Sequence, residues 1–182
     1  MSTKKQSPLG KGYIQVYTGN GKGKTTAALG LAFRAMGCGL KTYIGQFMKG
    51  KQYSELNAVK MVSSYITIEQ YGKKKFTEVK NPPDAEDVRI AKAGLVKARE
   101  VMLSGKFNII VLDEINTAYF FHLIAISEML DFIKDKPDGV ELVFTGRYAP
   151  QELIDAADLV TEMVEVKHYY RNGTVSRKGI ED

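Results

Sequence analysis

The stretch Tyr13-Ile-Gln-Val-Tyr-Thr-Gly-Asn-Gly-Lys-Gly-Lys-Thr-Thr-Ala-Ala28 joins an apolar strand pattern to a glycine-rich turn and then to the start of a helix. The turn contains three alternating glycines, Gly19, Gly21 and Gly23. Glycines at this spacing let main-chain N–H groups point toward one centre, and the helix that begins at Thr25 directs its positive dipole end there. The stretch therefore predicts a cradle for phosphates, with the amine of Lys24 on the phosphates and the hydroxyl of Thr25 on Mg²⁺.

One position of this turn departs from the Walker pattern. The pattern requires glycine five residues before Gly23, and the chain has Thr18 there. A Gly-Lys-Thr triplet is common by chance, so an ordinary glycine-rich turn between a strand and a helix is the alternative. The preceding strand and the following helix are the context that the motif requires, and they favour nucleotide binding.

Length and composition indicate one domain. The chain has 182 residues, of which 44% are hydrophobic and 26% charged, and its longest apolar runs are too short to cross a bilayer. The polar segment Met1–Lys11 has no apolar centre of the kind that signal peptides carry. We expect a flexible N-terminal tail over residues 1–12, a single domain over residues 13–182, a cytoplasmic location and no membrane partner.

The charge and the cysteine content give weaker indications. The net charge of +5 suits an anionic partner, which is either a nucleic acid or a triphosphate. The single cysteine, Cys38, lies between two glycines with no metal-ligand spacing around it, and we interpret it as incidental.

A second strand end carries acidic residues. The apolar run Phe107–Leu112 is followed directly by Asp113 and Glu114. Acidic residues at the end of a buried strand are typical of a Walker B motif, which places carboxylates beside Mg²⁺ and the phosphates. A strand followed by an ordinary helix cap is the alternative, but the glycine turn favours the functional interpretation.

Two further strand ends carry polar residues. The β-like segment Thr42–Met48 ends in a stretch that contains Gln46 and Lys49, and Arg147 follows the strand pattern Val140–Thr145. Carboxyl ends of parallel strands form the edge at which ligands bind, so these residues are candidates for a nucleotide. The alternatives are a solvated loop for Gln46 and Lys49 and a surface ion pair for Arg147.

The remaining patterns alternate between strand and helix. Tyr71–Pro83 is a long loop with a lysine run between aromatic residues, predicted as a lid, as a second-substrate wall, or as a mobile basic loop. Thr117–Phe132 is predicted as one apolar helix that is either buried or part of a subunit interface. Asn172-Gly173 predicts a hairpin between two extended arms. The order predicts a P-loop (RecA-like) three-layer α/β fold, with a mainly parallel sheet and helices on both faces.

Six blocks of the sequence carry a resemblance to a known family. They are Thr18-Gly-Asn-Gly-Lys-Gly-Lys-Thr-Thr-Ala-Ala28, Gln46-Phe-Met-Lys-Gly50, Leu112-Asp-Glu114, Thr145-Gly-Arg147, Ala156-Ala-Asp-Leu-Val-Thr-Glu-Met163, and Lys167-His168 with Lys178-Gly-Ile-Glu181. In this order the chain resembles the corrinoid adenosyltransferases of the CobA/CobO/BtuR type. The resemblance covers nearly all of the chain beyond the N-terminal tail, and Thr18 in the Walker glycine position is part of that family's pattern.

The resemblance implies transfer of the 5′-deoxyadenosyl group of ATP to the cobalt(I) of a reduced corrinoid, with release of tripolyphosphate. It implies ATP held in the reverse sense along the loop, with Lys24, Thr25 and Glu114 as catalytic residues. Mg²⁺ would be held by Thr25 and Glu114, with Asp113 behind them. The residues implied to contact the nucleotide are Thr18, Gly19, Asn20, Gly21, Lys22, Gly23, Lys24, Thr25, Thr26, Arg34, Gln46, Lys49 and Arg147.

The family also uses an aromatic loop to displace the lower axial ligand of the corrinoid. Phe76 matches one of these aromatics, but Glu78 stands where relatives can carry tryptophan, and the chain has no tryptophan. Either Tyr71 or another side chain fills that place, or activation is weaker. The resemblance further implies a homodimer and an electron donor such as a flavodoxin-like protein. It leaves open which corrinoid is the acceptor, and whether the role is biosynthesis or salvage.

Two other functions fit the glycine turn and the acidic strand end. A RecA-like P-loop ATPase that acts on nucleic acid is the first, but the sequence shows no separate arginine finger or second motor domain, and we expect no nucleic-acid partner. A nucleotide-binding regulatory module without chemistry is the second.

Overall fold

The computed structural model describes residues 9–73 and 82–181. Their strands form one parallel sheet in the order β3-β2-β4-β5-β1-β6. The strands are β1 (Ile14–Thr18), β2 (Thr42–Phe47), β3 (Ile66–Tyr71), β4 (Ile109–Asp113), β5 (Glu141–Thr145) and β6 (Leu159–Glu162). The helices are α1 (Lys24–Met36), α2 (Ser54–Ala58), α3 (Ala85–Leu103), α4 (Ile115–Phe120), α5 (Ile126–Lys134) and α6 (Gln151–Ala156), with 3₁₀ turns η1 (Val59–Val62) and η2 (Tyr169–Asn172).

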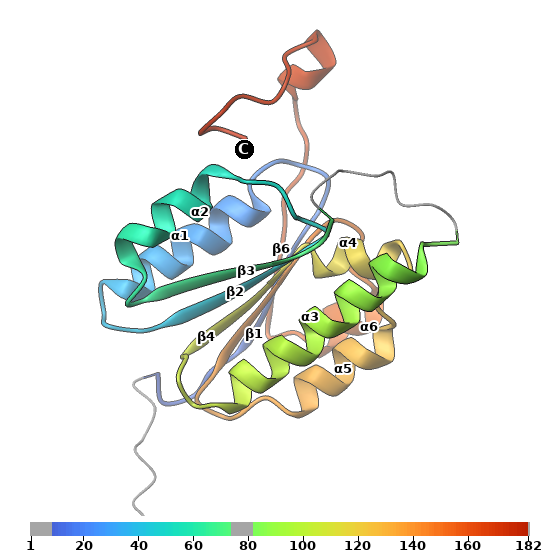
Figure 1. Cartoon of the computed structure of the whole chain (residues 1–182). Helices are drawn as coiled ribbons and strands as arrows, with labels where there is room; N and C mark the ends of the chain where they lie inside the picture. The colour runs from blue at the N-terminus through green and yellow to red at the C-terminus, as the bar shows by residue number, and fades with distance from the viewer. Residues whose placement is uncertain (1–8, 74–81, 182) are drawn as a thin grey trace, which may run out of the picture.

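Helices cover both faces of the sheet (Figure 1). Helices α1 and α2 lie on one face, and α3, α4, α5 and α6 lie on the other. Strand β4 shows why: Ile110 and Leu112 pack in the cluster that contains α3, whereas Ile109 and Val111 pack against the alanines of α1. Side chains of a strand alternate between faces, so an unbroken apolar strand feeds two cores. The predicted α/β fold with helices on both faces is confirmed.

The strand order brings the predicted motifs to one edge. Strand β5 lies between β1, which leads into the glycine turn, and β4, which ends at Asp113. Because the strands are parallel, the carboxyl ends of β1, β4, β5 and β2 meet at the same rim. The register pairs Leu112 of β4 with Phe144 of β5, so Asp113 and Thr145 lie beside each other just above the core.

The prediction of one helix over Thr117–Phe132 is wrong. The chain forms two short helices, α4 and α5, with a turn between them in which His122 has a φ of 60°. This turn contains neither glycine nor proline, so the sequence carried no breaker signal. Its apolar residues Leu123 and Ile124 are buried, and burial of these side chains accounts for the apolar pattern that suggested a continuous helix.

The C-terminal hairpin prediction is also wrong. Asn172 ends the 3₁₀ turn η2, and Gly173, with a φ of 83°, caps it by donating its N–H to Tyr169 and Tyr170 carbonyls. A left-handed glycine suits a helix cap as well as a hairpin turn, so the dipeptide was ambiguous. The strand β3 reaches Tyr71, which the sequence placed at the start of a loop.

The described part of the predicted N-terminal tail contacts the domain. Leu9 packs on the core, and the N–H of Gly12 donates to the carbonyl of Asp138 at 2.6 Å. Among the described residues, no helix combines the length and the apolar character needed to span a membrane.

Candidate active site

The glycine turn between β1 and α1 holds the side chain of Lys24. Gly19 and Gly23 have φ values of 90° and 122°, which only glycine adopts without strain. The buried Nζ of Lys24 donates to the carbonyl of Gly19 at 2.7 Å and to that of Gly21 at 2.8 Å. Burial lowers the pKa of Lys24, although Glu114 opposes the shift. The amine is therefore fixed at the mouth of the turn.

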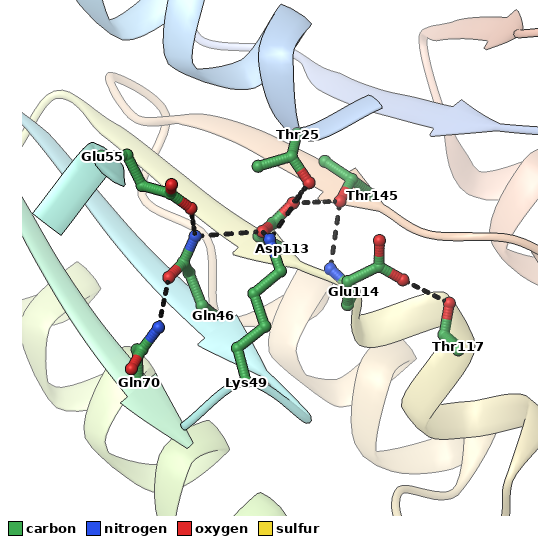
Figure 2. A network of polar contacts seen from close by, with 9 residues as sticks. All are labelled: Thr25, Gln46, Lys49, Glu55, Gln70, Asp113, Glu114, Thr117 and Thr145. Carbon is green, nitrogen blue, oxygen red and sulfur yellow. Dashed lines mark hydrogen bonds and ion pairs between the residues drawn. The ribbon is translucent and has the colours of Figure 1, made fainter. Parts of the chain in front are cut away.

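Asp113 is the centre of a polar network at the foot of this turn (Figure 2). Its side chain is fully buried, and its Oδ1 accepts from the hydroxyls of Thr25 at 2.9 Å and Thr145 at 2.7 Å. Its Oδ2 accepts from the Nζ of Lys49 at 2.8 Å. The network joins the helix α1 to strands β4 and β5 and to the loop after β2, so it fixes the hydroxyl of Thr25 relative to the sheet.

Gln46 supports Asp113 from the side. It is fully buried, and its Nε2 donates to Glu55 at 2.9 Å and to Oδ2 of Asp113 at 3.4 Å. Its Oε1 accepts from the Nε2 of Gln70 at 3.1 Å. Figure 2 shows this chain of amides running from β3 toward Asp113. The side chain that was predicted to contact a nucleotide is therefore used within the protein.

Glu114 occupies an unusual backbone conformation. Its φ of 62° is left-handed, and its N–H donates to the hydroxyl of Thr145 at 3.0 Å. Its carboxylate lines the cavity described below and accepts from the hydroxyl of Thr117 at 2.6 Å. Among the described residues, no group of three or more acidic, histidine or cysteine side chains is arranged so that it could hold a metal ion. Mg²⁺ nevertheless keeps several waters when it is bound, so it needs few ligands from the protein. A hydroxyl and one or two carboxylates are oxygen donors of the kind that it takes.

A cavity of about 530 Å³ opens over the turn, within the range of small-molecule sites. The sequence-predicted residues that line it are Gly21, Lys22, Gly23, Lys24, Thr25, Thr26, Lys49, Glu114 and Arg147. The predicted residues that do not line it are Thr18, Gly19, Asn20, Arg34, Gln46 and Asp113. Thr18 instead accepts a hydrogen bond from the N–H of Ala149 at 3.3 Å. The structure thus gathers most of the predicted cationic and hydroxyl groups around one space.

Arg34, which was predicted to contact the nucleotide, lies on α1 away from the cavity. It lies exposed in the last turn of α1, about 15 Å along the axis from Lys24 at a rise of about 1.5 Å per residue. Its role toward the nucleotide stays a prediction.

Of the two residues predicted for the corrinoid loop, the structure describes Tyr71. Phe76 lies outside the described residues. Tyr71 packs on Phe47, with ring centroids 5.6 Å apart, and its hydroxyl donates to Glu69 at 2.6 Å. A side chain on Gly94 of α3 would collide with the Tyr71 ring at 2.4 Å, so the ring lies between the sheet and α3.

Several residues that line the cavity were not predicted as site residues, although the C-terminal ones belong to a block that carries the resemblance. The cavity is also lined by Tyr53, Glu55, His168, Gly179, Ile180 and Glu181. The C-terminal segment leaves the sheet after β6 and returns above α1 and α2 (Figure 1), and no periodic pattern signals this return. Thr145 could have been found from the strand pattern, because a hydroxyl on the last residue of a buried strand neighbours the acidic end of the adjacent parallel strand.

Together these features define a P-loop α/β fold, in which the loop and several cations line one cavity and a buried strand-end aspartate holds the hydroxyl of Thr25. The chain matches the family model of the ATP:corrinoid adenosyltransferases BtuR/CobO/CobP over residues 10–181. It is 35% identical to a corrinoid adenosyltransferase of Sinorhizobium sp., over 94% of this chain and 80% of that protein. Corrinoid adenosyltransferases of Pseudomonas aeruginosa and Escherichia coli K12 are 32% and 30% identical, over 94% of this chain and 84% and 86% of their own lengths. The chain therefore belongs to this family and is an enzyme of this type.

Proposed function

We propose that this chain transfers the 5′-deoxyadenosyl group of ATP to the cobalt(I) of a reduced corrinoid and releases tripolyphosphate, in synthesis or salvage of adenosylcobalamin. The observation that carries the proposal is the arrangement of Lys24, Lys49 and Arg147 around the cavity over the glycine turn. The two substrates, ATP and a corrinoid, are those that the family description names. In such a reaction negative charge builds up on the departing polyphosphate, and these cations would stabilise that charge.

The reaction forms a cobalt–carbon bond as the bond between C5′ and the α-phosphate oxygen breaks. The electron pair of cobalt(I) enters the new bond, and the pair of the broken bond leaves with the triphosphate. Since cobalt(I) is already a strong nucleophile, the protein has no proton to remove from it. Its tasks are to orient the 5′ carbon and to stabilise the charge on the leaving group.

We assign these tasks to particular groups that line the cavity. The amine of Lys24 is fixed at the mouth of the turn, where it pairs with phosphate oxygens without a large rearrangement. ATP would lie in the opposite direction to that in an ordinary ATPase, with its ribose directed toward the corrin and its phosphate chain along the turn. Thr26 and Lys22 line the same cavity and extend the contacts to the phosphates.

Mg²⁺ fits the oxygen donors at the foot of the turn. Thr25 and Glu114 would hold it, and Asp113 would orient the hydroxyl of Thr25, to which it is bonded at 2.9 Å. When bound, Mg²⁺ would offset negative charge on the phosphate oxygens. The buried carboxylate of Asp113 keeps the hydroxyl in place, because Thr145 holds the same carboxylate oxygen at 2.7 Å.

The corrinoid side of the proposal rests on the family alone. On this proposal Phe76 is an aromatic residue of the corrinoid loop, and Tyr71 is the candidate for the place at which relatives can carry tryptophan. A flavodoxin-like protein or an equivalent donor supplies the electron. We further propose a cytoplasmic homodimer and a single domain over residues 13–182.

The direct test is an anaerobic assay with ATP, Mg²⁺ and chemically reduced cob(I)alamin. Formation of the adenosylcobalamin absorbance spectrum, lost on photolysis, supports the proposal. ATP hydrolysis to ADP without cobalt alkylation, and stimulation of that hydrolysis by DNA or RNA, would instead support the nucleic-acid ATPase.

A further inference from the structure

The hydrogen-bonding capacity of Asp113 is fully used. A carboxylate has about four lone-pair sites, and Asp113 accepts from four donors. Thr25 and Thr145 bond to Oδ1, whereas Lys49 and Gln46 bond to Oδ2. The carboxylate is fully buried. It can gain no further ligand or water unless one of these donors leaves.

Lys49 also contacts the hydroxyl that is assigned to Mg²⁺. Its Nζ lies 3.3 Å from Oγ1 of Thr25 and 2.8 Å from Oδ2 of Asp113. Because Thr25 donates its own hydrogen to Asp113, its oxygen accepts from Lys49 with one of its two lone pairs. One ammonium therefore covers oxygens of both residues.

Lys49 is the donor best able to leave. The other three are neutral groups on regular elements, and Gln46 is further held by Glu55 and Gln70. Lys49 follows β2 after Met48, whose φ is 58°, and its side chain is 15% exposed. Its ammonium lies over the ring of Tyr53, 5.4 Å from the centroid, on the cavity wall. A short movement takes it from Asp113 into the cavity.

Electrostatics favour such an exchange. A buried carboxylate without a counter-charge is costly, so Asp113 needs a cation. Burial of Lys49 opposes its charge, but attraction and hydrogen bonding to Asp113 outweigh it and raise the pKa of Lys49. A divalent cation at Thr25 would supply the counter-charge and repel the ammonium. Glu55 and Glu114 line the same cavity and also attract Lys49, and a bound triphosphate would add further negative charge there.

We propose that Lys49 competes with Mg²⁺ for the oxygens of Thr25 and Asp113, and that the displaced ammonium then pairs with the triphosphate. The second half of this inference rests on the proposed function. Lys49 thus occupies the metal position when the metal is absent, and it stabilises the leaving group after the metal has displaced it. Metal arrival and phosphate recognition are coupled through one side chain.

Titration of the nucleotide-free, full-length enzyme with Mn²⁺, followed by the electron paramagnetic resonance signal of the free ion, tests the competition. Lys49→Met should bind Mn²⁺ about tenfold more tightly than the unmodified chain, in the range of changes around a metal site. Lys49→Gln provides the same test if the methionine variant does not fold. Lys22→Met is the matched control, since Lys22 lines the same cavity but is exposed and contacts neither oxygen.

The same variants separate the inference from the proposed function. Lys49→Met should bind Mg²⁺·ATP more weakly although it binds Mn²⁺ more tightly, whereas Lys22→Met should leave Mn²⁺ affinity within about twofold. Unchanged or weaker Mn²⁺ binding in Lys49→Met would overturn the inference, as would an equal gain in Lys22→Met. The Mn²⁺ titration contains no ATP and no corrinoid, so its result is independent of adenosyl transfer by the unmodified enzyme.

Discussion

The main-chain N–H of Gly21 donates to the carbonyl of Met163 at 2.7 Å, which ties the phosphate turn to the residue after β6. A Cβ on Gly21 would come within 2.7 Å of that carbonyl oxygen. The N–H of Met163 also donates to the carbonyl of Thr18, at 2.8 Å. The shape of the turn therefore depends on an edge strand distant in sequence.

Gly21→Ala should weaken ATP binding, because the new methyl group must push the turn away from Met163 and misdirect its N–H groups. Isothermal titration with ATP measures the loss. Gly30→Ala is the matched control: Gly30 lies within α1, a Cβ there meets nothing within 4 Å, and the change should stabilise the helix by about 0.5–1 kcal/mol. Equal ATP affinity in both variants would contradict the role of the Met163 contact.

Lys24→Ala should lower kcat by about 10²- to 10³-fold, as expected for removal of one preorganised electrostatic group. The KM for the corrinoid should stay unchanged, because Lys24 faces the phosphates. Lys22→Ala, which removes an exposed lysine of the same turn, should lower kcat less. Steady-state adenosyl transfer measures both variants, and near-normal kcat in Lys24→Ala would remove Lys24 from the mechanism.

The sequence predicted those parts of the site whose structure is determined by short segments of the chain. The glycine turn and the acidic end of β4 were found because each follows an apolar strand directly, and parallel strands bring their ends together. The destination of Gln46 was not predictable, since a polar residue at a strand end can face solvent, a ligand or, as here, Glu55 and Asp113. The turn at His122 was missed because tertiary burial, not a local breaker, interrupts the helix.

The C-terminal segment carries a pH prediction. Hydrogen bonds from Arg177 and Tyr169 lower the pKa of Glu181 from 4.5 to about 2. A depressed pKa stabilises the folded form above the unfolded value, so the contact should persist at pH 5 and above and weaken as the pH falls from about 4.5 toward 2. The ¹³C shift of the Glu181 carboxyl group follows this titration. A midpoint near 4.5 would mean that Glu181 makes no such contact in solution.

The same segment should contribute to the nucleotide site. Removal of residues 179–182 takes away Gly179, Ile180 and Glu181 from the cavity wall and should raise the KM for ATP. The melting temperature should change little, because Ile180 is 56% exposed and outside both cores. Arg171→Ala, which breaks only the exposed pair with Glu165, should leave the KM unchanged. An unchanged KM after truncation would show that the segment does not contact ATP.

The exposed aromatic pair Phe120 and Tyr148 is the candidate surface for the proposed homodimer. The rings stack with centroids 4.1 Å apart and are 47% and 46% exposed. Phe120→Asp should convert a dimer to monomers, because a carboxylate opposes burial of the patch. Phe33→Asp, at a 68% exposed position on α1, should not. Sedimentation velocity distinguishes them, and a dimer that survives Phe120→Asp would place the interface elsewhere.

The most direct test of the central claim is the identity of the phosphate released per cobalt alkylated. In the proposed reaction the glycine turn binds the phosphate chain so that C5′, rather than the γ-phosphorus, meets the nucleophile. Under anaerobic conditions with ATP and cob(I)alamin, ³¹P NMR should show tripolyphosphate formed in step with adenosylcobalamin. Release of ADP and orthophosphate, with the corrinoid unmodified, would contradict it.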